Sequence, residues 1–115
     1  MTKNRLPRLG SVVWALLEDA NGFRKVRPAV VLTASAEITS GVAAVTTRVP
    51  DPLPEDHVLL PWDPQGTARS GLRRKCAAVS SWIAEASADD LQVVGALPAS
   101  VIDELLAKVA SRIDE

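Results

Sequence analysis

Arg27 combines a residue type and a position that point to chemistry. It directly precedes residues 28–32, a continuously apolar run that must be buried. An arginine at the start of a buried strand lies at the rim of the core, and its guanidinium faces whatever is bound or packed there. The residues alone leave two interpretations open. Arg27 either pairs with a carboxylate such as Glu18 or contacts a phosphate.

Three further side chains are candidates for chemistry. Thr46 ends an apolar alternation, so its hydroxyl either serves a site or bonds to the backbone. His57 opens a predicted strand after an acidic loop, and it is either a general base or a surface or packing residue. Cys76 lies in a basic segment that would lower the pKa of an exposed thiol, but with no histidine near it in sequence we expect it to be buried.

The composition predicts one packed domain without a bound metal. The chain has 115 residues, of which 47% are hydrophobic, and we expect a tail over residues 1–9 and a single domain over 10–115. One histidine, one cysteine and no carboxylate cluster at ligand spacing predict no metal site, no cofactor and no disulfide. No apolar run reaches the ~20 residues of a membrane helix, and no signal peptide is recognisable, so we expect a cytoplasmic protein.

Positive charge is concentrated in the first two thirds of the chain. Residues 1–76 contain eleven Lys or Arg and seven Asp or Glu, a net charge of +4, whereas residues 77–115 contain two and seven, a net charge of −5. The basic part includes clusters at residues 24–27 and 69–75. Such clusters either line a groove that follows a phosphate backbone or form an ordinary solvated face.

The hydrophobic pattern predicts a mainly β fold with a helix at the C-terminus. Strands are expected over residues 11–17, 26–33, 41–47 and 57–60, with a fifth around 75–79 and room for a sixth before 83. Ser87 is typical of a helix N-cap. A clearer amphipathic helix follows Pro98, with apolar residues at 102, 105, 106, 109 and 113. These elements predict a compact barrel-like sheet with a helix packed on it.

Five short segments occur in the order typical of MazF/PemK toxins. They are residues 10–14 (GSVVW), 27–32 (RPAVVL), 43–46 (AAVT), 70–74 (SGLRR) and 95–98 (GALP). The chain therefore resembles that family over nearly its whole length. The resemblance implies an SH3-like barrel of the MazF/CcdB/Kid type, a homodimer and a cognate antitoxin. It also implies a toxin of a type II toxin-antitoxin system, a metal-independent endoribonuclease that cleaves single-stranded RNA.

By position, the resemblance makes Arg27 and Thr46 the catalytic pair. The expected RNA contacts are Arg24, Lys25, Thr47, Arg48, Arg73, Arg74 and Trp82. The chemistry suits such side chains, because negative charge builds on the phosphate when the ribose 2′-OH attacks it. A guanidinium can stabilise that charge with two donors and a hydroxyl can add another. The base stays open between Glu18, His57 and a water.

One segment departs from the family pattern. Where family members carry an acidic residue, Gln and Arg, this chain has Ser81, Trp82 and Ala84. Trp82 either stacks on an RNA base or lies in the core or the dimer interface. This departure and the weak net charge keep a second interpretation open, a non-nuclease toxin on the same fold, similar to the gyrase inhibitor CcdB, or a catalytically inactive relative.

Overall fold

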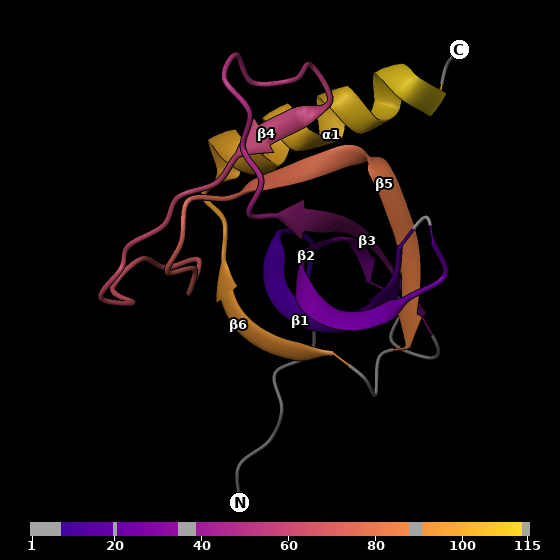
Figure 1. The fold of residues 1–115 in the computed structure, drawn as a ribbon, viewed down its shortest axis with the longest axis horizontal. Coiled ribbons are helices and arrows are strands. Elements are labelled where there is room, and N and C mark those ends of the chain that lie inside the picture. Colours follow the sequence, from indigo (N-terminus) through magenta and orange to yellow (C-terminus); the bar gives the residue numbers. More distant parts are fainter. Residues whose placement is uncertain (1–7, 20, 35–38, 88–90, 114–115) are drawn as a thin grey trace, which may run out of the picture.

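A curved antiparallel sheet and one helix form the computed structural model, which describes residues 8–19, 21–34, 39–87 and 91–113. The elements are β1 (Ser11–Glu18), β2 (Arg24–Ala34), β3 (Thr39–Thr46), β4 (His57–Leu59), β5 (Ala77–Ser87), β6 (Gln92–Ala96) and α1 (Ala99–Ile113). The strand order is β4-β5-β3-β2-β1-β6, and every neighbouring pair is antiparallel. The sheet curls into a half-barrel, and α1 crosses one side of it (Figure 1).

The structure confirms the mainly β prediction with a C-terminal helix and corrects it after residue 76. Strands β1 to β4 and α1 lie where the pattern predicts them, whereas β5 is longer than expected and runs to Ser87. The prediction of Ser87 as a helix N-cap is wrong, and residues 88–90 lie outside the described part. Val93 pairs with Val13 of β1 instead. This long-range pairing of β-branched residues overrides a local capping signal.

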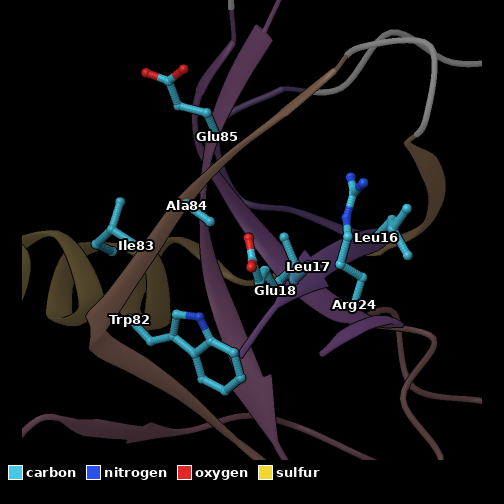
Figure 2. Close-up of a pocket in the computed structure, with 8 residues that line it drawn as sticks. All are labelled: Leu16, Leu17, Glu18, Arg24, Trp82, Ile83, Ala84 and Glu85. Carbon is cyan, nitrogen blue, oxygen red and sulfur yellow. The ribbon is translucent and has the colours of Figure 1, made fainter. Parts of the chain in front are cut away.

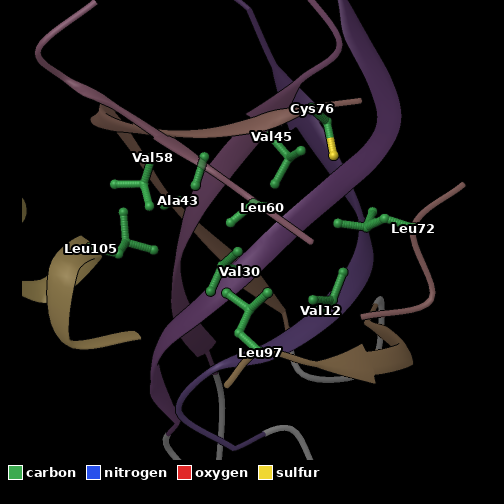
Figure 3. Packing of buried hydrophobic residues seen from close by; sticks show 11 residues of the cluster. Val12, Val30, Ala43, Val45, Val58, Leu60, Leu72, Cys76, Leu97 and Leu105 are labelled. Carbon is green, nitrogen blue, oxygen red and sulfur yellow. The ribbon is translucent and has the colours of Figure 1, made fainter. Parts of the chain in front are cut away.

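Two apolar cores pack on opposite faces of the central strands, which explains why β1, β2 and β3 read as unbroken apolar runs. The helix-side core contains Val12, Val30, Ala43, Val45, Val58, Leu60, Leu72, Cys76, Ala78, Leu97 and Leu105 (Figure 3). The second core contains Val13, Ala15, Leu17, Ala29, Val31, Val42, Ala44, Ala86 and Leu91, with Trp82, Ala84 and Val93 packed against it.

The helix is held to the sheet by one buried side and one lysine. Leu105 is buried, and Ile102 and Val109 pack against the helix-side core, as their spacing predicts. Lys108 Nζ donates to the main-chain carbonyl oxygens of Glu55 and His57, at 2.7 and 3.1 Å. Within the described residues, no helix has both the length and the apolar character needed to cross a membrane.

Strand β5 turns a corner in its middle. Ala43 of β3 lies opposite Ile83, whereas Val45, only two residues later, lies opposite Ala78. Residues 79–82 of β5 therefore face a single residue of β3, and the strand bends sharply at this point (Figure 1). Irregularities of this kind redirect side chains and are frequent beside functional sites.

Candidate active site

The registers of β2 and β3 bring Arg27 and Thr46 together. The last pairs between these strands are Val30 with Ala43 and Ala29 with Ala44. Continued by two residues, the same register places Arg27 opposite Thr46. Because side chains alternate between the two faces of a sheet, both lie on the face of the second core. The register therefore directs two residues that are 19 positions apart in sequence to the same end of this strand pair.

Pro28 explains why the β2–β3 pairing ends there. A proline has no N–H to donate, so it is tolerated only where no ladder partner faces it. Pro28 pairs with Trp14 of β1, and the recorded pairing with β3 begins one residue later, at Ala29. Arg27 therefore lies beyond the end of the β2–β3 pairing, although β2 stays paired with β1 as far as Arg24.

Arg27 is half-buried and has no polar partner. Its Nε is buried without a hydrogen-bond partner, and the side chain makes no hydrogen bond or ion pair with any residue that the structure describes. The alternative of a structural pair with Glu18 is therefore wrong for this structure. The contact that Arg27 does make is with an aromatic ring, because its Cζ lies 4.7 Å from the centroid of Trp82. This distance is within the range of a cation–π interaction.

Thr46 keeps a donor available. Its Oγ1 accepts a hydrogen bond from the N–H of Arg48 at 3.1 Å, in a turn just beyond β3. A hydroxyl that accepts from the backbone still has its own hydrogen to donate. The side chain is partly exposed, so this hydrogen can reach a ligand at the open end of the sheet.

The corner of β5 carries Trp82 and is anchored by Asp56. The main-chain oxygen of Asp56 accepts from the N–H and the Oγ of Ser80, at 2.7 and 2.9 Å. Its carboxylate accepts from Ser81 Oγ at 2.6 Å and from His57 Nδ1 at 2.7 Å. The hydrogen bond from Ser81, followed by the one from His57, holds the pKa of Asp56 below its ordinary value of 3.8. These bonds attach the corner directly before Trp82 to the loop that precedes β4.

Two adjoining hollows lie around Trp82. The first, which we call the Trp82 hollow, has a volume of about 380 Å³ and is lined by Leu16, Leu17, Glu18, Arg24, Trp82, Ile83, Ala84 and Glu85 (Figure 2). The adjoining one is lined by Glu18, Asp19, Asn21, Ser81 and Trp82. Glu18 and Trp82 line both. In Figure 2 the Glu18 carboxylate lies between Trp82 and Arg24, and Glu85 points away. Neither Glu18 nor Arg24 forms an ion pair within the described part of the chain.

A separate hollow lies around Trp14, and we call it the Trp14 hollow. Its volume is about 440 Å³, and it is lined by Trp14, Pro28, Thr47, Gly71, Leu72, Arg73, Arg74, Cys76 and Val94. Pro28 and Thr47 are the chain neighbours of Arg27 and Thr46, which themselves line none of the three hollows.

The residues expected to bind RNA therefore divide between these hollows. Arg24 and Trp82 line the Trp82 hollow, whereas Thr47, Arg73 and Arg74 line the Trp14 hollow. Lys25 and Arg48 are exposed and line none of the three hollows.

His57 supports the β5 corner through Asp56, and Cys76 lines the Trp14 hollow. His57 lines none of the hollows, and its Nδ1 bonds to Asp56. Cys76 is buried, as expected, and burial raises the pKa of its thiol to about 11. Among the described residues, no three His, Cys, Asp or Glu side chains are grouped so that they could hold a metal ion.

Sequence reasoning missed the contact between Arg27 and Trp82. The alternatives considered for Trp82 were an RNA base, the core and a dimer interface. The core alternative holds in part, because the ring packs against the second core, and its other contact is with the Arg27 guanidinium. No local signal predicts this, because the two residues are 55 positions apart and meet only through the β5 corner. The sequence offers one hint of this contact, a large aromatic residue, Trp82, directly after the two small polar residues Ser80 and Ser81.

Known proteins resemble this chain in structure rather than in sequence. No protein-family model matches the sequence, and no curated protein matches it. MazF from Deinococcus radiodurans superposes with a TM-score of 0.76 at 18% identity, over 97% of this chain and 100% of that one. A MazE–MazF structure from the same organism gives 0.71 at 22% identity, over 96% and 98%.

A further match is to the Mycobacterium tuberculosis toxin MazF-mt6. It gives a TM-score of 0.67 at 20% identity, over 90% of this chain and 96% of that one. The chain therefore has the MazF fold, at low sequence identity. This confirms the sequence-based expectation of a barrel of the MazF/CcdB/Kid type with a C-terminal helix.

Proposed function

We propose that this protein is a toxin of a type II toxin-antitoxin system that cleaves single-stranded RNA. The observation that carries the proposal is the state of Arg27. A half-buried guanidinium without a carboxylate partner in the described residues, just beyond the last β2–β3 pair, keeps its charge and donors available for an anion. A phosphate of the RNA backbone fits this need in charge and in geometry.

The proposed reaction is a transesterification. The ribose 2′-oxygen attacks the adjacent phosphorus and loses its proton to a base, and the bond from phosphorus to the 5′-oxygen breaks. The 5′-oxygen leaves with a proton from solvent, and the other product carries a 2′,3′-cyclic phosphate. Arg27 donates to the non-bridging oxygens while their negative charge builds, and Thr46 donates through the hydrogen that its bond from Arg48 leaves free.

Glu18 is the better placed of the two candidate bases. Its carboxylate lines both hollows around Trp82, the ring that contacts Arg27, and it has no ion-pair partner in the described part of the chain. His57 already bonds to Asp56 through Nδ1 and lies outside these hollows. We therefore propose Glu18 as the proton acceptor.

The test incubates the purified protein with a long single-stranded RNA in the presence of EDTA and maps the new ends. Discrete cuts with 2′,3′-cyclic phosphate ends are expected. Arg27→Ala should lower the rate by about 10²–10³, the usual cost of losing one such donor. Arg27→Lys should recover little, because an ammonium lacks the planar pair of donors. Arg8→Ala is the matched control, since Arg8 is exposed and lines none of the three hollows.

Two results would contradict this proposal. Intact RNA from a protein that is toxic on expression would exclude the nuclease, and gyrase inhibition by the same protein would establish the CcdB-like alternative. Cuts that persist unchanged in Arg27→Ala would show that the activity belongs to a contaminant or to another site.

We also propose a cognate antitoxin as the partner. MazF of D. radiodurans has been crystallised with MazE, which supports a partner of this kind for a chain with the same fold. The net positive charge of residues 1–76 favours an acidic peptide. Co-purification with the product of a neighbouring gene, and loss of RNA cleavage in that complex, would test this partner.

The second proposed partner is another copy of the chain. Trp14, Leu16 and Val26 are exposed on the paired strands β1 and β2, and Leu16 lies directly opposite Val26. Such a strip is typical of a surface that is covered in an oligomer. Sedimentation at micromolar concentration should show a dimer, and Leu16→Glu should yield a monomer. A wild-type protein that sediments as a monomer would refute the homodimer.

A further inference from the structure

The Trp82 ring packs against the Arg27 guanidinium. The ring centroid lies 4.7 Å from Cζ, and the ring itself is half-buried against the second core. A ring held in this way cannot follow a mobile guanidinium. The guanidinium therefore takes the orientation that the ring imposes.

A ring and a carboxylate hold an arginine in different ways. A carboxylate binds the N–H edge of the guanidinium, neutralises its charge and occupies the donors. An aromatic ring interacts with the face of the guanidinium through its quadrupole and leaves the N–H edge unused. Arg27 has the second arrangement, because it makes no hydrogen bond or ion pair with the described residues. Its charge and its remaining donors stay available for a ligand.

The position of the ring is set by the β5 corner. Asp56 accepts from Ser81 Oγ and from Ser80 N–H and Oγ, and both serines lie directly before Trp82. His57 pairs with Val79 in the adjacent strand register, which fixes the entry into the corner. Val79, Ser80 and Ser81 are thus tied to the β4 side, and these ties fix the backbone that leads into Trp82.

We propose that Trp82 is a positioning residue for Arg27, whose face it holds so that the donors of the guanidinium point at the phosphate. This inference rests on the proposed nuclease function. It assigns a function to Trp82, one of the residues at which this chain departs from the family pattern. The tryptophan holds the arginine through its ring face and does not itself touch the reacting atoms.

The first readout is independent of activity. In a ¹⁵N-resolved NMR spectrum, the Arg27 Nε–H signal, identified by its loss in Arg27→Lys, is expected to be shifted by the Trp82 ring current and protected from exchange with water. Trp82→Met removes the ring at similar length and should return the signal to the position of exposed arginines. Trp82→Phe keeps a π face and should retain most of the shift. A wild-type signal without a shift overturns the inference.

The second readout separates positioning from RNA binding. Trp82→Met should lower kcat by about two- to fivefold, the range that corresponds to a partly desolvated cation–π contact, with KM unchanged. Trp82→Phe should recover most of kcat. Trp62→Leu is the control, because Trp62 is exposed and lines none of the three hollows. A raised KM with unchanged kcat would overturn the inference and make Trp82 a platform for an RNA base.

The two proposals fail in different ways. A wild-type protein that cleaves no RNA but shows the shifted Nε–H signal would overturn the nuclease, while the hold of the ring on Arg27 would stand. If Trp82→Met does not fold, the wild-type signal decides, and an unshifted signal would overturn the positioning role.

Discussion

Replacing Arg27 by methionine should abolish RNA cleavage and at the same time stabilise the fold. Arg27 is half-buried, and its Nε is buried without a partner. In the absence of a bound anion the fold therefore carries the desolvation cost of a donor that bonds to nothing. Methionine has a similar length, has no donor and can pack against the Trp82 ring.

The size of the effect follows from two opposing contributions. An unsatisfied buried donor costs about 1–3 kcal/mol. Loss of the contact with Trp82 removes about 0.5–1 kcal/mol of stabilisation, because the guanidinium is only partly desolvated. The net change is a gain of about 1 kcal/mol in the free energy of unfolding. With an unfolding entropy of about 2.1 cal/mol/K per residue over 115 residues, this gain raises Tm by about 4 °C.

Thermal unfolding followed by circular dichroism, at the same protein concentration for each variant, measures the change in Tm. Arg8→Met is the control, and its Tm should stay within about 1 °C of wild type because Arg8 is exposed. A lower Tm in Arg27→Met would refute the reasoning, because it would show that the guanidinium is satisfied in the free protein. Arg27 would then be a structural residue, and the argument from its missing partner would fall.

Three further predictions concern Thr46, Asp56 and Cys76. Thr46→Val should lower the cleavage rate by about 10²-fold, because it removes a donor to the phosphate. Thr46→Ser keeps the hydroxyl and should retain most activity. Thr67→Val, at an exposed loop position, is the control and should have wild-type activity. Because the hydrogen bond from Ser81 lowers the pKa of Asp56, its contribution to stability should be complete above about pH 4 and be lost as pH falls through the folded-state pKa. Urea denaturation between pH 2.5 and 6 should therefore show a steeper acid loss in wild type than in Asp56→Asn, and parallel curves would count against it. Cys76, whose thiol pKa is raised to about 11 by burial, should resist iodoacetamide at pH 8 when folded and react in urea, and rapid alkylation of the native protein would contradict its burial.

Local patterns predict most of the fold because the apolar periodicities of this chain agree with its tertiary packing. The runs that begin at Ser11 and Val26 form strands whose central residues are buried in one or other core, although Trp14, Leu16 and Val26 stay exposed. The helix after Pro98 buries the side that its spacing indicates. The pattern fails at Ser87, where a capping signal is overridden by the pairing of β6 with β1. An N-cap stabilises a helix by only about 1 kcal/mol, which is too little to outweigh the pairing of a whole strand.

The sequence by itself determined that Arg27 lies at the rim of the core. Five apolar residues follow it and must be buried, whereas its own charge must stay near the surface. The sequence left open what the guanidinium faces, because that depends on residues distant along the chain. Only the tertiary structure decided this, through the end of the β2–β3 pairing at Ala29 and the β5 corner that places Trp82 against the face of the guanidinium. Partner choice across a sheet depends on register and bends, which short-range periodicity does not specify.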